Sequence, residues 1–527
     1  MHLRQQCICG NNAPSCELLW ITCFIIPRLC VRENGDMTHD LLLDLDDAQR
    51  SAASAVEGPV RIIAGAGAGK TRTIMHRIAY ACQTGAWDPE RSLAVTFSTK
   101  AAQEMQSRLQ VLGVGQVHAA TFHSAALQQL RSVWDDLSES PFPQVTDNAK
   151  DLVFRALARS TGRDSYQELE VQDVQAEIDW AKVGLIAPSD YGRACRLLGR
   201  VPPLGMDCIQ MKSVMEAYEE EKAYRGQIDF NDILLLVCHI LDEDSSSARQ
   251  IRSHIDSLTV DEYQDVSPLQ HRLVQLWLKD NRNICVVGDP AQTIYSFAGA
   301  TSYYLINFSR EFSPVTADIQ LATDYRSTRN IVKEANKILK PSPVRDDYLF
   351  LESARDTGRR ISKRMYSCDD EESCSVVEKI KRLIHKGEKA EDIAVLMRIN
   401  SQGKILAQYL QKAKIAYRVR TESGWVSQAG HDSMMNADGS VGQISLSTIH
   451  ASKGLEWKRV FIIGCSEGLI PFSSSKSDDA LEEERRLLYV GITRAQDNLE
   501  ISYAQAAHPQ ETGGVGGSVR QPSRFLL

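Results

Sequence analysis

The sequence AGAGAGKT spans residues 64–71 and directly follows the β-branched run PVRII. Its three glycines let backbone N–H groups approach a phosphate, because no Cβ stands in the way. The lysine can reach the β- and γ-phosphates, and the threonine hydroxyl can ligate Mg²⁺. A strand, a glycine-rich turn and a helix in this order are typical of a P-loop. They predict an α/β fold that binds ATP and Mg²⁺ through Ala64, Gly65, Ala66, Gly67, Ala68, Gly69, Lys70 and Thr71.

Two adjacent acids, Asp261 and Glu262, follow a second apolar run, SLTV. Adjacent acids are usually a solvated surface pair, but the apolar strand before them and the upstream P-loop favour a catalytic pair. Asp261 is expected to join Thr71 in the Mg²⁺ shell, and Glu262 to activate the attacking water. Gln264 and Asp265 follow at once, and a simple nucleotide switch would not need them.

A chain of 527 residues is too long for one hydrophobic core, so about three or four domain-sized units are expected. Apolar runs such as SLAVTF and NICVVGD are typical of a parallel sheet with ligands at the carboxyl ends of its strands. Charged stretches such as VMEAYEEEKAYRG predict a helical insertion. The expected units are an N-terminal extension (1–43), a first α/β domain (44–123 and 227–318), a helical insertion (124–226), a second α/β domain (319–424 and 441–527) and a short loop (425–440).

The bulk composition is that of an ordinary globular protein, with a net charge of -8. Nucleic-acid binding therefore requires a local basic channel rather than a basic surface overall. Most of the thirteen cysteines lie in apolar surroundings, which indicates reduced thiols in a cytosolic protein. The apolar run at residues 18–26 is too short to span a bilayer. It is either part of a targeting segment or precedes a true start at Met37, and in the second case deletion of residues 1–36 should leave activity intact.

Two longer motifs, VDEYQDVSPLQ and VVGDPAQTIYSFAGA, resemble motifs II and III of superfamily 1 DNA helicases of the UvrD/Rep/PcrA type. Six more stretches resemble the remaining motifs of that family in the family's order. The resemblance covers roughly residues 44–527 and implies two RecA-like P-loop NTPase domains with parallel sheets, plus a helical insertion in the first. The six stretches are LDDAQRSAA, LAVTFSTKAAQEM, TFHSAAL, DYRSTRNI, LSTIHASKGLEWKRVFI and EEERRLLYVGITRAQDNL.

The resemblance implies roles at the ATP site for residues outside the P-loop. Gln292 would sense the γ-phosphate, and Arg326 and Arg494 would act as arginine fingers from the second domain. Gln264 would couple the nucleotide state to DNA, supported by Asp265. The implied adenine and ribose contacts are Gln49, Arg72, Tyr325 and Glu456.

The same family places single-stranded DNA across both domains, with bases stacked on aromatic side chains. The matching positions for these DNA contacts are Thr96, Phe97, Thr121, Phe122, His123, Tyr295, Phe297 and His450. The stretch YSFAGA departs from the family pattern YxWRGA, because Phe297 replaces Trp and Ala298 replaces Arg. We expect stacking to survive on a smaller ring, and the lost cation to weaken DNA binding at this step.

The stretch between Arg326 and His450 is short for this family, whose better-known members carry a large regulatory subdomain there. About 20 polar, glycine-containing residues precede the motif at 446–462, and they cannot build a domain core. We therefore expect this subdomain to be absent and duplex unwinding by the isolated protein to be weak.

The resemblance implies an ATP-dependent, 3′-to-5′ single-stranded DNA translocase and helicase acting in repair, replication or recombination. Its partners would be single-stranded DNA, single-strand/duplex junctions and an accessory repair or replication protein, with no membrane. A cytoplasmic, nucleoid-associated location is expected in a bacterium, with organellar or nuclear targeting left open. Two alternatives remain: a P-loop kinase or metabolic ATPase, and a DNA-stimulated ATPase that remodels nucleoprotein complexes without processive unwinding. No clustered acids outside the motifs indicate a nuclease.

Overall fold

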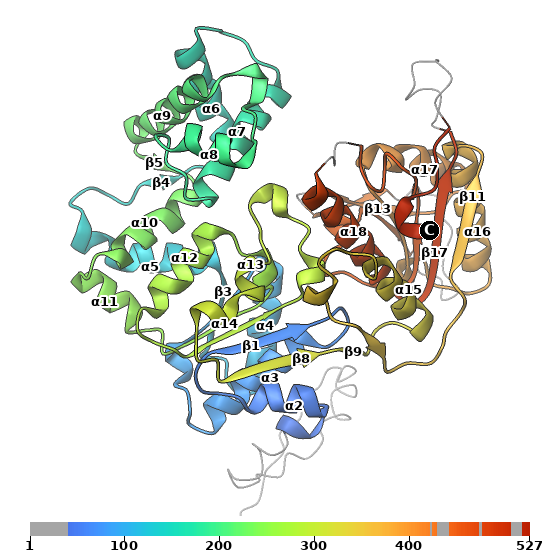
Figure 1. Ribbon diagram of the computed structural model, residues 1–527, viewed down its shortest axis with the longest axis horizontal. Helices are drawn as coiled ribbons and strands as arrows, with labels where there is room; N and C mark the ends of the chain where they lie inside the picture. The colour runs from blue at the N-terminus through green and yellow to red at the C-terminus, as the bar shows by residue number, and fades with distance from the viewer. Residues whose placement is uncertain (1–40, 422–423, 429–441, 474–476, 507–518) are drawn as a thin grey trace, which may run out of the picture.

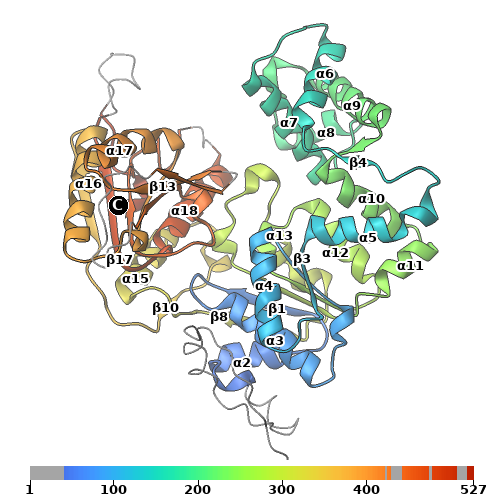
Figure 2. The same cartoon turned by 180° about the vertical axis from the view of Figure 1, so that it is seen from behind.

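The computed structural model describes residues 41–421, 424–428, 442–473, 477–506 and 519–527. Two α/β domains lie side by side, and a helical insertion projects from the first of them (Figure 1). The view from behind shows the same separation of the three parts (Figure 2). The predicted fold class is confirmed. Residues 1–40, which hold most of the expected extension (1–43) and the alternative start at Met37, lie outside the described residues. No helix among the described residues is long and apolar enough to cross a bilayer.

The first domain is built on a six-stranded sheet in which every pairing is parallel. Its four central strands are buried along most of their length, because β-branched and other apolar residues fill both faces. All the strands end at one edge, where the P-loop follows β1 and the acid pair follows β6. In sheet order they are β3 (His118–Thr121), β2 (Ser92–Thr96), β6 (Ser257–Val260), β7 (Ile284–Gly288), β1 (Val60–Ala64) and β8 (Ala317–Leu321).

Helices cover both faces of this sheet, and their apolar sides fill two hydrophobic cores. Short N-cap side chains begin several of them, such as Asp46 at α2, Ser98 at α4 and Thr121 at α5. The helices are α2 (Asp47–Ser54), α3 (Lys70–Gln83), α4 (Thr99–Val111), α5 (Phe122–Leu137), α10 (Phe230–Asp242), α11 (Ser246–Arg252), α12 (Pro268–Leu278), α13 (Tyr303–Ile306) and α14 (Phe308–Glu311).

Two predicted boundaries of the first domain are wrong. Helix α5 packs into the core of the first domain, so the helical insertion does not begin at residue 124. Strand β8 pairs with β1 along its whole length, so a boundary at residue 318 would cut through the first sheet. An edge strand with alternating burial carries little of the apolar signal that marks a buried strand, which explains the second error.

The insertion is a separate bundle of four helices with its own core. The chain enters and leaves it through two short strands, β4 (Gln144–Val145) and β5 (Gln227–Ile228), which pair in parallel. Both ends of the insertion therefore lie next to each other above α10 (Figure 1). Its helices are α6 (Ala149–Thr161), α7 (Glu168–Val183), α8 (Tyr191–Leu198) and α9 (Cys208–Arg225).

The second domain contains a seven-stranded sheet that is parallel except for its last pair. Strands β13 and β14 form an antiparallel ribbon at one edge, and β11 forms the other edge. The segment 425–440 was expected to be a loop, but its first four residues belong to β14, and residues 429–441 lie outside the described residues. In sheet order the strands are β11 (Ser362–Tyr366), β17 (Ala495–Ala504), β16 (Trp457–Ile462), β12 (Ile393–Met397), β15 (Ile444–Thr448), β13 (Tyr417–Thr421) and β14 (Gly424–Gln428).

The two domains share part of a hydrophobic core. Ala66 of the P-loop and Ala291 and Ile294 of the first domain pack among apolar residues of the second domain. The ATP-binding loop is therefore part of the domain interface. A small two-stranded sheet, β9 (Thr323–Asp324) with β10 (Glu352–Ser353), lies where the chain crosses. The helices of the second domain are α15 (Arg329–Leu339), α16 (Asp369–His385), α17 (Asn400–Lys412) and α18 (Asp478–Ile492).

Candidate ATPase site and nucleic-acid interface

The P-loop joins β1 to α3 at the carboxyl edge of the first sheet. Gly67 and Gly69 have φ angles of 71° and 76°, which glycine adopts without the steric cost of a side chain. A Cβ on Gly67 would also overlap the Asp324 carboxylate of the second domain. The Lys70 Nζ donates to the Ala64 carbonyl at 3.3 Å, and no carboxylate in the described chain forms an ion pair with it. This loop has the backbone shape and the uncommitted cation that a nucleoside triphosphate requires.

Asp261 and Glu262 lie at the carboxyl end of β6, two strands away from the P-loop strand. Burial raises the pKa of Asp261 to about 7, and the charge of Glu262 adds to this rise. Burial also opposes ionisation of Glu262, but Lys70 and Lys453 together hold its pKa below the usual value. A cation bound to Asp261 would offset the burial of its carboxylate, so it suits a Mg²⁺ ligand. Glu262 is ionised, as a general base must be.

The backbone at Glu262 is strained. Its φ is 53°, in the left-handed region that few residues other than glycine adopt. Its N–H donates to Asp261 Oδ1 at 2.9 Å, which helps to hold this conformation. Strained residues of this kind persist where the surrounding structure fixes them, and they cluster at functional sites.

Gln264 connects the loops that follow β6 and β7. Its Nε2 donates to Glu262 Oε2 at 2.5 Å and to Asp265 Oδ2 at 3.1 Å, and its Oε1 accepts from the Asp289 N–H at 3.0 Å. Gln292 is buried and donates to Asp289 Oδ2 at 2.7 Å. Burial raises the pKa of Asp289. Asp289 was not predicted as a site residue, although it directly follows the apolar run NICVVG.

The second domain contributes Arg326 and Arg494 to this region. Arg494 is buried, and its guanidinium donates to two backbone carbonyls at 3.0 and 3.2 Å. Burial lowers the pKa of Arg494 to about 10, the neighbouring Arg326 adds to this, and the charge of Glu262 opposes it. Arg326 forms an ion pair with Glu456. The structure thus brings the two predicted arginine fingers together, and Arg494 lies within electrostatic reach of Glu262 across the domain boundary.

The predicted adenine contacts surround the start of α3. Gln49 is buried, and its Nε2 donates to a P-loop carbonyl at 3.0 Å. The Tyr325 N–H donates to another P-loop carbonyl at 3.0 Å, and its hydroxyl donates to the carboxylate of Asp46, the N-cap of α2. The side chains of Tyr325 and Arg72 are each about half exposed. An accessible tyrosine ring and a guanidinium beside the P-loop fit the faces of a purine.

Lys453 of the second domain reaches into the first domain. Its Nζ forms an ion pair with Asp265 and donates to the Gln292 carbonyl at 2.6 Å. The Asp265 and Lys453 side chains are only 1% and 10% exposed. Burial raises the pKa of Asp265 to about 6, although Lys453 opposes this rise. The same ammonium lies 5.1 Å from the centroid of the Tyr295 ring. Lys453 was not predicted as a site residue, although it belongs to the motif TIHASKGLEW.

Helix α18 adds a second set of contacts across the boundary. Glu483 accepts from the Ser296 N–H at 2.9 Å, and Arg486 Nε donates to the Thr293 carbonyl at 2.6 Å. Both contacts involve the segment that follows Gln292. The γ-phosphate sensor predicted at Gln292 is therefore held between Lys453 and α18.

Four aromatic side chains from both domains form a cluster at this boundary. Phe97, which follows β2, stacks on Tyr295 with ring centroids 5.8 Å apart and planes 6° apart. Phe297 packs edge-on against Tyr295 at 6.1 Å and against His450 at 5.9 Å. The Tyr295 hydroxyl donates to the His450 carbonyl at 3.1 Å. Phe97 and Phe297 remain 48% and 68% exposed, so their rings are available to stack on bases.

Phe122 does not belong to this cluster, and its predicted role as a DNA contact is wrong. It is 3% exposed and stacks on Trp277 in the core, with centroids 5.9 Å apart. It occupies the first position of α5 and points into the sheet side of that helix. The Thr96 side chain is also buried, and its hydroxyl lacks a hydrogen-bond partner in the described chain. Thr96 can therefore contact DNA only if its surroundings move.

Thr121 and His123 lie at the start of α5. The Thr121 hydroxyl caps the helix by accepting from the Ser124 N–H at 3.1 Å. His123 Nε2 is buried with no hydrogen-bond partner in the described chain, and burial lowers its pKa. Its ring packs edge-on against Phe230, which is exposed. Phe230, in the stretch DFNDILLL, is an accessible aromatic residue that the sequence analysis did not single out.

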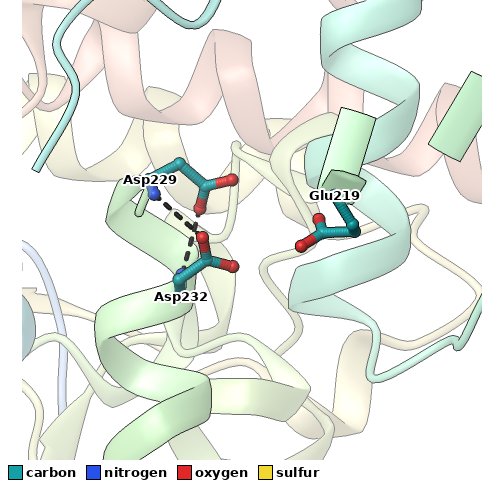
Figure 3. Close-up of side chains that lie close together, drawn as sticks. All are labelled: Glu219, Asp229 and Asp232. Atoms are coloured by element: carbon teal, nitrogen blue, oxygen red, sulfur yellow. Dashed lines mark hydrogen bonds between the residues drawn. The ribbon is translucent and has the colours of Figure 1, made fainter. Parts of the chain in front are cut away.

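Three carboxylates outside these motifs lie close together: Glu219 on α9 and Asp229 and Asp232 at the start of α10 (Figure 3). Asp229 and Asp232 each accept a backbone N–H of the other, which caps α10. The ammonium groups of Lys182 and Lys222 form ion pairs with all three carboxylates. Two lysine ammonium groups occupy the positions where a cation would lie. The group is therefore an ion-pair network that joins the insertion to the first domain, with Glu219 at its exposed side.

The fold and this geometry define a class of protein. A P-loop lies at the boundary between two RecA-like domains, and an acid pair lies at the end of a strand two places away in the same sheet. Arg326 and Arg494 of the second domain lie together across this boundary, with Arg494 in electrostatic reach of Glu262. Residues 45–313 match the family model of the UvrD/REP helicase N-terminal domain. Residues 319–429 and 427–506 match the model of the UvrD-like helicase C-terminal domain. The chain belongs to the UvrD-like helicase family.

Relatives with this architecture occur in several bacteria. The chain is 35% identical to the ATP-dependent DNA helicase UvrD2 of Mycobacterium tuberculosis over 581 aligned positions, which cover 92% of this chain and 81% of the relative. It is 31% identical to the ATP-dependent DNA helicase PcrA of Bacillus subtilis, over 73% of this chain and 51% of the relative. For PcrA of Staphylococcus aureus the values are 29%, 72% and 51%. The chain thus matches only about half the length of the PcrA proteins.

Proposed function

We propose that this protein is an ATP-dependent DNA helicase that moves 3′ to 5′ along single-stranded DNA in repair, replication or recombination. The observation that carries the proposal is the position of Lys453. Its ammonium pairs with Asp265, two hydrogen bonds from Glu262 through Gln264, and it lies against the Tyr295 ring of the aromatic cluster. A side chain in this position can link hydrolysis to a surface on which bases stack.

In the proposed mechanism, the chain's own groups position the nucleotide and the water. Lys70 and the P-loop amides hold the phosphates, Tyr325 and Arg72 hold the adenine, and Glu262 accepts the proton of the attacking water. Thr71 and Asp261 are the residues that fit a Mg²⁺ ion, which when bound neutralises phosphate charge. Arg326 and Arg494 stabilise charge that develops in the transition state. Because these arginines belong to the second domain, ATP favours closure of the cleft.

Closure changes the DNA surface because that surface spans the same boundary. Phe97, Tyr295 and Phe297 belong to the first domain, whereas His450 belongs to the second. Movement between the domains therefore changes the spacing of these rings. Repeated closure and opening would advance a strand whose bases stack on them.

A second function, remodelling of nucleoprotein complexes without processive unwinding, is favoured by the length of the chain. The alignment with UvrD2 has 581 positions, more than the 527 residues of this chain, so that relative carries segments that this chain lacks. The match to the C-terminal family model also falls into two pieces that meet at residues 427–429. We infer that the regulatory subdomain that better-known family members carry at this point is missing from this chain. Its loss would weaken unwinding without removing translocation.

Steady-state ATP hydrolysis with and without a poly-deoxythymidine oligonucleotide tests the main proposal. We expect strong stimulation by DNA in the wild-type protein and its loss in Glu262→Gln. ATP hydrolysis that is indifferent to DNA would contradict the coupling through Lys453. Strand displacement on duplexes with a 3′ or a 5′ single-stranded tail then tests polarity. Efficient translocation without displacement on either substrate would favour the remodelling function.

A further inference from the structure

The outer flank of the second domain carries a concentrated positive charge. Strand β11 and helix α16 lie on the side of this domain that faces away from the first domain in both views (Figures 1 and 2). A hollow of about 600 Å³ lies between them, and seven of its sixteen lining residues are Arg or Lys while two are Glu. This local excess of cations is opposite in sign to the net charge of the whole chain, which is -8.

A second hollow, of about 790 Å³, lies on the other side of β11, against α15. Four of its eight lining residues are Arg or Lys, and one is Glu. Side chains alternate along a strand, so Arg364 borders the first hollow and Lys363 the second, while Ser362 at the start of the strand borders both. The strand thus runs between two basic hollows, which we call the α16 hollow and the α15 hollow.

Several of these cations have no acidic partner among the described residues. Lys379 and Arg364 share Glu500, and Lys363 pairs with Glu334. By contrast, no described carboxylate forms an ion pair with Arg360, Arg382, Lys386 or Lys333. Like charges that gather without counter-ions destabilise a folded surface, so an anionic ligand would bind here with favourable electrostatics.

The outer edge of β11 is also unpaired. On one side the strand pairs with β17 from Ser362 to Tyr366, and no described strand pairs with its other side. Its three central residues are exposed, including Met365 at 57%. Charged residues on an edge strand often serve only to prevent aggregation. That explanation covers the charges on β11 itself, but it does not explain why cations from α15, α16 and β16 line the hollows on either side of this strand.

We propose that β11 binds an extended acidic segment of a partner protein, which adds a strand to the sheet. An added peptide uses both the free N–H and the free C=O groups of the edge, whereas a phosphate can accept only from the N–H groups. Successive side chains of the peptide would point alternately into the α16 hollow and the α15 hollow. Both hollows are basic, so a peptide with acidic residues on both of its faces should bind best.

The test measures binding of a fluorescein-labelled peptide with four Glu-Val-Asp repeats to the full chain by fluorescence anisotropy. The matched peptide has four Glu-Pro-Asp repeats, which keep the charge but cannot pair along a strand edge. The reversing variant is Arg382→Glu/Lys386→Glu in the α16 hollow. Its matched control is Lys381→Glu/Lys412→Glu, which makes the same change of charge on the same domain at residues that line neither hollow.

We expect the valine peptide to bind, and the proline peptide and the reversing variant each to weaken binding by at least about tenfold. The control variant should bind as the wild type does, and DNA-stimulated ATP hydrolysis should be the same in both variants. Equal binding of the two peptides, or no binding of the valine peptide, would overturn the proposal. So would a reversing variant that binds the peptide normally but loses affinity for duplex DNA, because the flank would then be a nucleic-acid surface. None of these readouts depends on whether ATP hydrolysis drives unwinding.

Discussion

Replacing Lys453 with methionine would leave Asp265 buried without its ion-pair partner. The Asp265 side chain is 1% exposed, its Oδ1 has no hydrogen-bond partner in the described chain, and its Oδ2 otherwise accepts only from Gln264 at 3.1 Å. Breaking a buried pair from one side costs about 3–5 kcal/mol. The pair joins the two domains, so its loss destabilises the arrangement in which the domains are closed on each other. If hydrolysis requires closure, DNA-stimulated kcat should fall by about 100-fold or more, since about 1.4 kcal/mol corresponds to tenfold.

The assay is a double-mutant cycle on DNA-stimulated ATP hydrolysis. Lys453→Met should show the large loss, and Lys453→Met/Asp265→Asn should recover at least about tenfold of it, because the neutral pair leaves no buried charge. The loss should also depend on pH. Burial holds the pKa of Asp265 at about 6 with Lys453 opposing, so removing the lysine raises it further. Protonation then neutralises the carboxylate, and the ratio of variant to wild-type activity should rise as pH falls from about 8 to about 6.

Two results would refute this reasoning. The first is a double variant no more active than Lys453→Met, which would mean that the lysine acts through another contact, such as the Gln292 carbonyl. The second is a ratio of variant to wild-type activity that does not change with pH. Thermal melting of each variant serves as the control for a general loss of folding.

Four further substitutions test the DNA-binding surface, the core of the first domain and the P-loop. Phe297→Ala should weaken binding of a labelled oligodeoxythymidine by about 1–3 kcal/mol in anisotropy titrations. Phe122→Ala should instead lower the stability of the first domain by about 3–5 kcal/mol in chemical unfolding. The opposite pattern would contradict the placement of Phe297 at the DNA-binding surface and of Phe122 in the core. Gly67→Ala should abolish binding of a fluorescent ATP analogue, because its φ of 71° is strained for alanine and its Cβ would overlap a carboxylate of the second domain; unchanged affinity would count against the P-loop geometry. Ala298→Arg should tighten oligonucleotide binding by restoring a cation beside the exposed Phe297 ring, more so at low salt, and an unchanged affinity would argue against a DNA path there.

The sequence signals for the nucleotide site are local. A P-loop and an acid pair after an apolar strand each lie within a few residues, and the structure places both at one edge of the sheet. Local sequence did not predict the position of Phe122 correctly. An aromatic residue at the start of a helix gives the same sequence pattern whether its ring faces solvent or, as here, packs on Trp277. The ion-pair partner of Asp265 could not be predicted from local sequence either. Lys453 lies 188 residues away in the other domain, and only the packing of the two domains brings them together.

The domain boundaries show a related limit. Strand β8 alternates between partly buried and exposed residues at the edge of the first sheet, so its pattern does not reveal which sheet it joins. Helix α5 is continuous with the start of the insertion in sequence, and only its contacts assign it to the first core. In both cases the sequence identifies an element, but long-range packing decides its neighbours.

The parallel pairing of β4 and β5 makes the helical insertion a removable module. The Gln144 N–H donates to the Gly226 carbonyl and the Thr146 N–H to the Ile228 carbonyl, at 3.0 and 2.8 Å, so the two attachment points are hydrogen-bonded neighbours. A bridge of a few glycines could replace everything between them without stretching the first domain. The loss would expose the acids of the network at the start of α10, which Lys182 and Lys222 neutralise from the insertion side. Neutralising Asp229 and Asp232 together with the deletion would therefore yield a minimal two-domain motor, into which other modules could be grafted.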